Sequence, residues 1–144
     1  MEPLITLIVG FGAARLAGLA GVDALDNWQA SLRVGLALMF LLTAFAHFQP
    51  RLRADLIGMV PPSLPRPDLL VTVTGLLEFA GAIGLLIPAT APWAALCLAL
   101  LMIAMFPANV SAARRQVAQG DPIGPRTALQ ILFIAAAILA AVRT

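Results

Sequence analysis

The chain has 144 residues, of which 61% are hydrophobic and only 11% are charged, and its mean hydropathy is +0.97. Soluble domains carry about a quarter charged residues and are less than half apolar, so this composition excludes a soluble globular protein and indicates an integral membrane protein. The net charge is only +2 and all nine basic residues are arginines. Arginines in loops and at helix ends usually report membrane orientation, so nothing here indicates a nucleic-acid partner.

Apolar segments of membrane-spanning length follow one another along the whole chain, since about 20 residues of helix cross the hydrocarbon core. We expect a single all-α transmembrane domain covering residues 1–144, with spans at residues 4–22, 30–48, 69–88, 91–110 and 127–142. The first span is marginal because Arg15 interrupts it, and an arginine at a helix centre is costly. Partial burial of this segment in the membrane interface is the alternative.

The connections carry recognisable turn and cap signals. Asp23, Asp26 and Asn27 suit helix N-caps, and Trp28 suits the aromatic belt at a membrane surface. In the loop of residues 49–68, the stretch RLRADLIGMV predicts a short helix lying on the membrane, followed by the proline-rich stretch VPPSLPRP. Proline is welcome at the first helical position, which makes Pro67 a candidate start for the third span.

The fourth span contains Pro107, which is expected to kink its helix and to free the carbonyl of Ile103. We expect this helix to continue beyond the span through SAARRQVAQ and to stop at Gly120. Asn109 is a candidate partner for the freed backbone.

Arginine counting predicts the orientation of the spans. With five spans, the loops at residues 49–68 and 111–126 lie on the same side, and together they hold six of the nine arginines. We expect both loops to be cytoplasmic, and the core of spans two to five keeps this orientation even if the first segment does not span.

Glu78 is the residue around which we expect the other helices to be arranged. It stands near the middle of the third span, and all its neighbours one turn away are small: Thr74, Gly75, Gly81 and Ala82. An acid at this depth is costly and usually faces a partner or a cavity. Our hypothesis is that Glu78 pairs with Arg15. Such a pair is either a structural tether, which is the simpler interpretation, or a site that handles protons or binds a cation.

Few other residues could carry chemistry. His47 ends the second span and is either an interfacial anchor or a contact to a headgroup, a quinone or a partner. It is the only histidine, so a His-rich metal site is not expected. The single cysteine, Cys97, lies in a span and is expected to be a small buried hydrophobe; it excludes dithiol chemistry within one chain.

Small residues also recur at helical spacing. Gly10, Ala14 and Gly18 form a stripe on the first segment, and such stripes allow membrane helices to approach closely. The same holds for the small residues around Glu78. The sequence leaves open whether these stripes pack within the chain or between the subunits of a homodimer.

Four motifs resemble the DoxX family of small bacterial integral membrane proteins: AFAHFQP, VPPSLPRPDLL, TGLLEFAGAIGLLIP and AMFPANV. The resemblance covers roughly residues 33 to 140 and implies an antiparallel core of four transmembrane helices. The first segment with Arg15 is then an additional N-terminal membrane helix. The positions that carry the resemblance are His47, Phe48, Pro50, Pro61, Pro62, Pro65, Gly75, Glu78, Gly81, Gly84, Phe106, Pro107, Asn109 and Val110.

The resemblance implies a bacterial cell membrane (inner membrane) location and links to quinone-coupled sulfur oxidation or to complexes that resist oxidative stress. We expect an accessory subunit without self-contained catalysis, which binds a protein partner, a lipid or a quinone in a pocket framed by Glu78, His47 and the VPP loop. One alternative is a quinone-linked oxidoreductase subunit in which Glu78 or His47 handles protons. Another is a small transporter with a water-filled path to Glu78.

Overall fold

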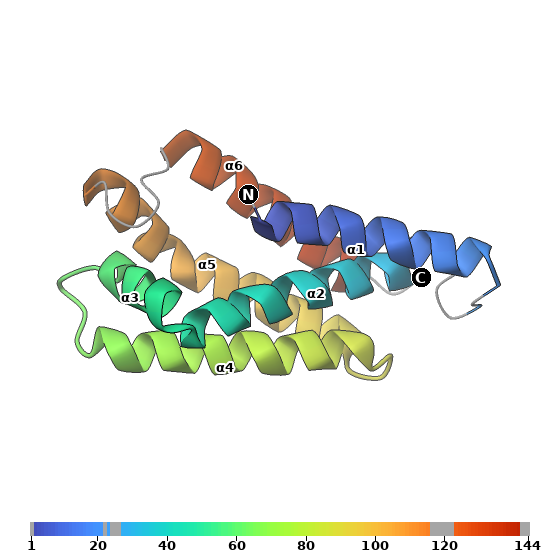
Figure 1. The fold of residues 1–144 in the computed structure, drawn as a ribbon, viewed down its shortest axis with the longest axis horizontal. Coiled ribbons are helices and arrows are strands. Elements are labelled where there is room, and N and C mark those ends of the chain that lie inside the picture. Colours follow the sequence, from blue (N-terminus) through green and yellow to red (C-terminus); the bar gives the residue numbers. More distant parts are fainter. Residues whose placement is uncertain (1, 22, 24–26, 116–122, 142–144) are drawn as a thin grey trace.

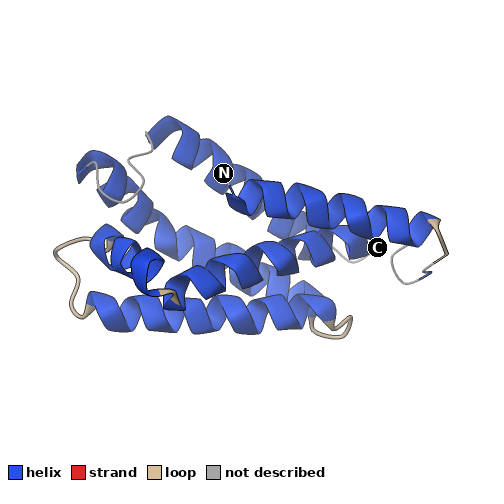
Figure 2. Cartoon of the chain, in the orientation of Figure 1, coloured by secondary structure: helices blue, strands red, loops and turns tan. Residues whose placement is uncertain are grey.

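The computed structural model describes residues 2–21, 23, 27–115 and 123–141, and within these ranges it is helical without strands (Figure 2). The described residues form six helices: α1 (Glu2–Leu19), α2 (Trp28–Phe48), α3 (Pro50–Met59), α4 (Pro67–Leu86), α5 (Ala91–Arg115) and α6 (Ile123–Ala141). Each of the five expected spans falls on one of the longer helices, and the short helix predicted in the loop is α3. The continuation of α5 is confirmed to Arg115, and the predicted stop at Gly120 lies outside the described residues.

Three of these helices are long and apolar enough to cross a membrane: α2, α4 and residues 91–108 of α5. The apolar stretches of α1 and α6 are shorter, at Leu4–Leu19 and Thr127–Ala141. Many large apolar side chains point outward, including Ile8, Leu76 and Ile131, whose exposed fractions are 61%, 57% and 63%. A soluble monomer rarely exposes such continuous apolar surface, so the outer face fits contact with lipid.

Local signals explain where the helices begin. The side-chain oxygen of Asn27 accepts a hydrogen bond from the backbone of Ala30 at 2.7 Å and caps α2, as predicted. The side chain of Gln49 does the same for α3 by accepting from the backbone of Leu52 at 2.9 Å. Pro67 is the first residue of α4, also as predicted. The tight break at Gln49 therefore separates α2 from α3 without a long loop.

The helices pack around α2 (Figure 1). Helix α2 contacts α1, α4 and α6, and α5 contacts α4 and α6. The buried apolar side chains come from every one of these helices and include Leu7, Leu36, Met39, Phe40, Ala82, Leu85, Ala95, Leu98, Met102 and Ala137. Helix α3 has no buried residue and lies beside the ends of α2, α4 and α5.

The stripe of small residues on α1 is used within the chain. Gly10, Ala14 and Gly18 are all buried, and α1 packs along α2. A Cβ atom at Gly35 of α2 would lie 2.8 Å from the carbonyl oxygen of Leu7. The two backbones are therefore in direct contact, which only glycine permits.

Polar side chains close the opposite end of the bundle from α3. The side-chain amide of Gln29 donates to the carbonyl of Leu139 at 3.0 Å, and Nε of Arg33 donates to the carbonyl of Ala140 at 2.9 Å. The last carbonyls of a helix lack intrahelical partners. The first turns of α2 thus satisfy the C-terminus of α6, and Arg33 adds a favourable charge at the negative end of that helix.

Candidate functional site: a buried histidine and glutamate pair

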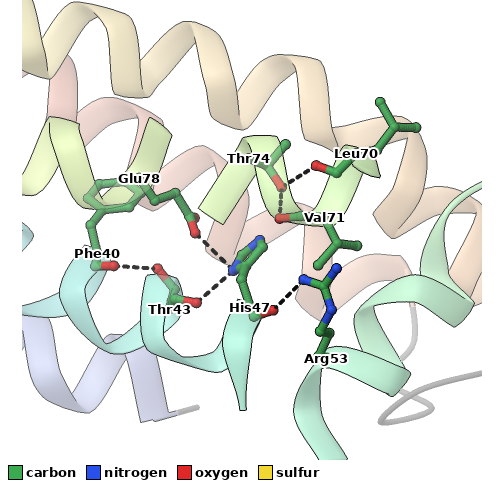
Figure 3. A network of polar contacts seen from close by, with 8 residues as sticks. All are labelled: Phe40, Thr43, His47, Arg53, Leu70, Val71, Thr74 and Glu78. Atoms are coloured by element: carbon green, nitrogen blue, oxygen red, sulfur yellow. Dashed lines mark hydrogen bonds and ion pairs between the residues drawn. The ribbon is translucent and has the colours of Figure 1, made fainter. Parts of the chain in front are cut away.

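The side chains of His47 and Glu78 meet inside the bundle (Figure 3). His47 lies in the last turn of α2 and Glu78 near the middle of α4. The imidazole Nδ1 lies 3.1 Å from Oε2 of the carboxyl group. Both residues are buried, with exposed fractions of 3% and 5%. The pair joins two helices that are long and apolar enough to span a membrane.

The main chain of α2 holds the imidazole ring in place. Nδ1 lies 2.7 Å from the carbonyl oxygen of Thr43, one turn earlier on the same helix. A carbonyl can only accept, so Nδ1 carries the hydrogen and donates to Thr43. Oε2 of Glu78 lies beside the same nitrogen without hydrogen-bond geometry, and it makes no hydrogen bond among the described residues. The site therefore contains a buried carboxyl oxygen without a hydrogen-bond partner in the described part of the chain.

The glycine at position 75 is what admits the histidine ring. A Cβ atom there would lie 2.7 Å from Cβ of His47 and 3.0 Å from the ring of Phe48. Real Cβ atoms do not approach other atoms this closely, so α4 must present bare backbone at this point. Gly75 thus allows α2 and α4 to come together at the height of the pair.

Arg53 of α3 makes hydrogen bonds to the end of α2 and to the first turns of α4. Its guanidinium donates to the carbonyl of His47 at 3.0 Å, to the carbonyl of Asp68 at 3.0 Å and to Oγ1 of Thr72 at 2.7 Å. The planar fork of arginine suits several acceptors at once, and a cation is favourable at the C-terminus of α2. Arg53 therefore connects α2, α3 and α4 next to the buried pair, and Figure 3 shows its bond to His47.

We predict that Arg53→Met lowers the free energy of unfolding by about 1.5–3 kcal/mol, because it removes charged hydrogen bonds and leaves the His47 carbonyl without its donor. Arg51→Met on the same helix is the matched control, since Arg51 is exposed and should change stability by less than about 0.5 kcal/mol. Thermal unfolding of both variants in detergent gives the comparison. Equal stability of the two variants would contradict the role given to Arg53.

The predicted pairing of Arg15 with Glu78 is wrong: no ion pair joins these two residues in the described part of the chain, and the side chain that lies against Glu78 is His47. Helix α1, which carries Arg15, packs along α2, and α2 in turn packs along α4. The prediction rested on the opposite charges of the two residues and on their similar depth in the membrane. Depth does not determine which helices are neighbours, so the sequence could not choose between Arg15 and His47.

Other small residues of α4 also contact neighbouring helices within the chain. A Cβ atom at Gly81 would lie 2.5 Å from the side chain of Leu98, and one at Gly84 would lie 2.8 Å from Cβ of Ala94. Both partners belong to α5. The small residues around Glu78 thus contact α2 and α5. For these residues, the stripe packs within the chain and not between subunits.

Helix α5 continues through Pro107. Proline removes the hydrogen bond to the carbonyl four residues earlier, which is that of Ile103. The side-chain amide of Gln130 on α6 donates to the adjacent carbonyl of Met102. Asn109 was the predicted partner for the freed backbone, but its side chain lies outside the part of the structure that is described. Gln130 is a partner of this backbone that the sequence did not lead us to expect.

A groove opens at the same end of the bundle as α3. Its volume is about 440 Å³, and it is lined by the following residues: Pro61, Phe106, Pro107, Val110, Ser111 and Arg114. The groove therefore combines the VPP loop with the FPANV motif of α5. Glu78 and His47 do not line this groove, although the sequence led us to expect them in one pocket with the VPP loop.

Cys97 is exposed on α5, so the prediction that it is buried is wrong. Its neighbours Ala95, Leu98 and Ala99 are buried instead. An apolar segment on all sides gives no sign of which face turns inward. Within the described residues, no group of three or more His, Cys, Asp and Glu side chains could hold a metal ion.

No curated protein and no solved structure matches this chain. A family model matches residues 36–141, which run from the middle of α2 to the last described residue of α6. The match includes both members of the buried pair, Arg53 and the whole lining of the groove, and it leaves α1 outside. The chain therefore belongs to the family DUF8561, a domain of unknown function.

Proposed function

We propose that this protein is a DoxX-like accessory subunit of a bacterial cell membrane, which binds an amphiphilic ligand such as a lipid or a quinone, or a membrane partner, without self-contained catalysis. The proposal includes an antiparallel transmembrane core of α2, α4, α5 and α6, with α1 as an additional membrane helix. It also places the loops at residues 49–68 and 111–126 on the cytoplasmic side.

The arrangement of the helices supports this topology. Helices α2, α4, α5 and α6 contact one another in a closed ring, and each crosses in the direction opposite to its predecessor if all four span. The family model begins inside α2 and does not include α1. A helix that packs on one side of this ring is consistent with an addition to a shared core.

The separation between the groove and the buried pair supports a binding role over catalysis. The groove has apolar walls and opens at the surface, as expected for a site that takes an apolar ligand. The chemically reactive side chains, His47 and Glu78, are packed away from it. The pair then serves mainly to hold α2 against α4 at the level where α3 begins.

Native mass spectrometry of the protein, extracted gently from its own membrane, tests the proposal. We expect a bound lipid or quinone that is lost in Val110→Trp, because the larger side chain fills the groove. Leu100→Trp on the same helix is the control, since Leu100 points outward with 59% exposure and its variant should retain the ligand. A protein without ligand, or equal retention in both variants, would contradict binding in the groove.

A second function is favoured by one observation, the buried Oε2 of Glu78 that makes no hydrogen bond among the described residues. Such an oxygen beside an imidazole can take up and release a proton. The protein would then be a subunit that supplies protons to a quinone-linked oxidoreductase. Quinone reduction by the membrane complex that falls more than tenfold in Glu78→Gln, at equal amounts of folded protein, would favour this function over simple binding.

A further inference from the structure

The groove between the VPP loop and α5 has a charge arrangement that selects among amphiphiles. Its lining on α5 follows one helix face, because Phe106, Val110 and Arg114 are four residues apart. Pro107 belongs to the same face, and Pro61 closes the groove from the loop. The walls are therefore apolar at one end and carry a single cation at the other.

The position of the groove matches the boundary of the membrane. The apolar stretch of α5 that is suited to cross a bilayer runs from Ala91 to Ala108. Phe106 and Pro107 lie in its last turn, and Arg114 lies seven residues beyond Pro107, which is about 10 Å along a helix. A ligand in this groove would have its apolar part at the edge of the hydrocarbon and its polar part among the headgroups.

The cation at the rim is available for a ligand. Arg114 is exposed, and no acidic side chain pairs with it within the described part of the chain. The lining contains no acid. An arginine presents a fork of donors that fits a phosphate, whereas a quinone carries no charge that Arg114 could neutralise.

From this charge complementarity, we infer that the groove binds a phospholipid with an anionic headgroup, with an acyl chain against Phe106 and Pro107 and the phosphate at Arg114. The inference rests on the proposed binding function and names its ligand class. The bilayer itself supplies the ligand, since anionic lipids and basic protein segments meet at the cytoplasmic surface of membranes. The same arginine would then anchor the end of α5 at that surface.

Competition between two lipids tests the inference. The purified protein is offered equal amounts of phosphatidylglycerol and phosphatidylethanolamine with identical acyl chains, and the bound lipids are counted by native mass spectrometry. We expect phosphatidylglycerol to be retained about tenfold more, because the ammonium group of phosphatidylethanolamine cancels the net negative charge that attracts a headgroup to Arg114. Arg114→Gln should abolish the preference. Arg51→Gln, which removes an exposed arginine outside the groove, should preserve it.

The outcomes separate this inference from the proposed function. Equal retention of the two lipids by the unchanged protein, with both lost in Val110→Trp, overturns the anionic preference and leaves amphiphile binding intact. A preference that survives Arg114→Gln overturns the role of that residue. Displacement of bound phosphatidylglycerol by an equimolar quinone overturns the assignment to a phospholipid. If neither lipid is retained, or if Val110→Trp does not change retention, the proposed binding function itself is contradicted.

Discussion

His47→Leu is expected to destabilise the protein more than the simultaneous change of His47→Leu and Glu78→Met. Removing one partner of a buried polar pair typically costs about 1–3 kcal/mol, because the other polar group stays buried without compensation. Replacing both partners by apolar residues of similar volume removes that penalty. Within the described residues, His47 is the basic side chain that lies against the carboxyl group of Glu78, so the second change should rescue most of the loss.

The free energies of unfolding of the two single variants and the double variant, measured in one detergent, give the coupling energy of the pair. Arg15→Leu combined with Glu78→Met is the matched control, and its two effects should add. Asp55→Asn, at an exposed position on α3, should leave stability unchanged. Additive effects for His47 and Glu78 would contradict their pairing, and strong coupling between Arg15 and Glu78 would restore the pairing expected from membrane depth.

Gly75→Ala is expected to cost about 1–3 kcal/mol of stability, the usual range for overpacking. The added methyl group would lie 2.7 Å from Cβ of His47 and 3.0 Å from the ring of Phe48. Helix α4 must move away from α2, and the contact between His47 and Glu78 lengthens with it. The substitution therefore acts on the pair without altering either of its members.

Gly58→Ala is the matched control for this prediction, because a Cβ atom at Gly58 meets nothing within 4 Å and alanine favours a helix by about 0.5–1 kcal/mol over glycine. We expect thermal unfolding in detergent to show a lower midpoint for Gly75→Ala and an unchanged or higher midpoint for Gly58→Ala. In addition, Gly75→Ala should cost less when combined with His47→Gly/Glu78→Met, because glycine at position 47 removes the Cβ atom and the ring carbon that the added methyl group would meet. Equal costs in both backgrounds would contradict this explanation.

The helices themselves could be predicted because their signals are local. Long apolar stretches, the cap at Asn27 and the start at Pro67 indicate helix type and position without knowledge of the neighbours. The short helix α3 was predictable for the same reason. Helix ends were less certain: α1 begins at Glu2 and ends at Leu19, three residues before the predicted end of its span, since apolar composition alone does not show where hydrogen bonding stops.

The candidate site was only half predictable. Glu78 was found because a carboxyl group within an apolar span is costly and requires a partner. His47 and Arg53 were each visible in the sequence, but their roles depend on α2 ending beside the middle of α4 and on α3 folding back against both helices. The spacing of Thr43 and His47, four residues apart on one helix, was the only local sign that the ring is held by the main chain.

By itself, the sequence determined that this protein is helical and apolar enough for a membrane, and that small residues line the helix carrying its buried acid. These properties depend on composition and on the period of a single helix. Only the tertiary structure decided that Glu78 meets His47 instead of Arg15, that Cys97 faces outward, and that the groove lies apart from the buried pair. The physical reason is that a helix which is apolar on all sides does not encode which face meets which neighbour, and the choice depends on the close approach of whole helices at residues such as Gly35 and Gly75.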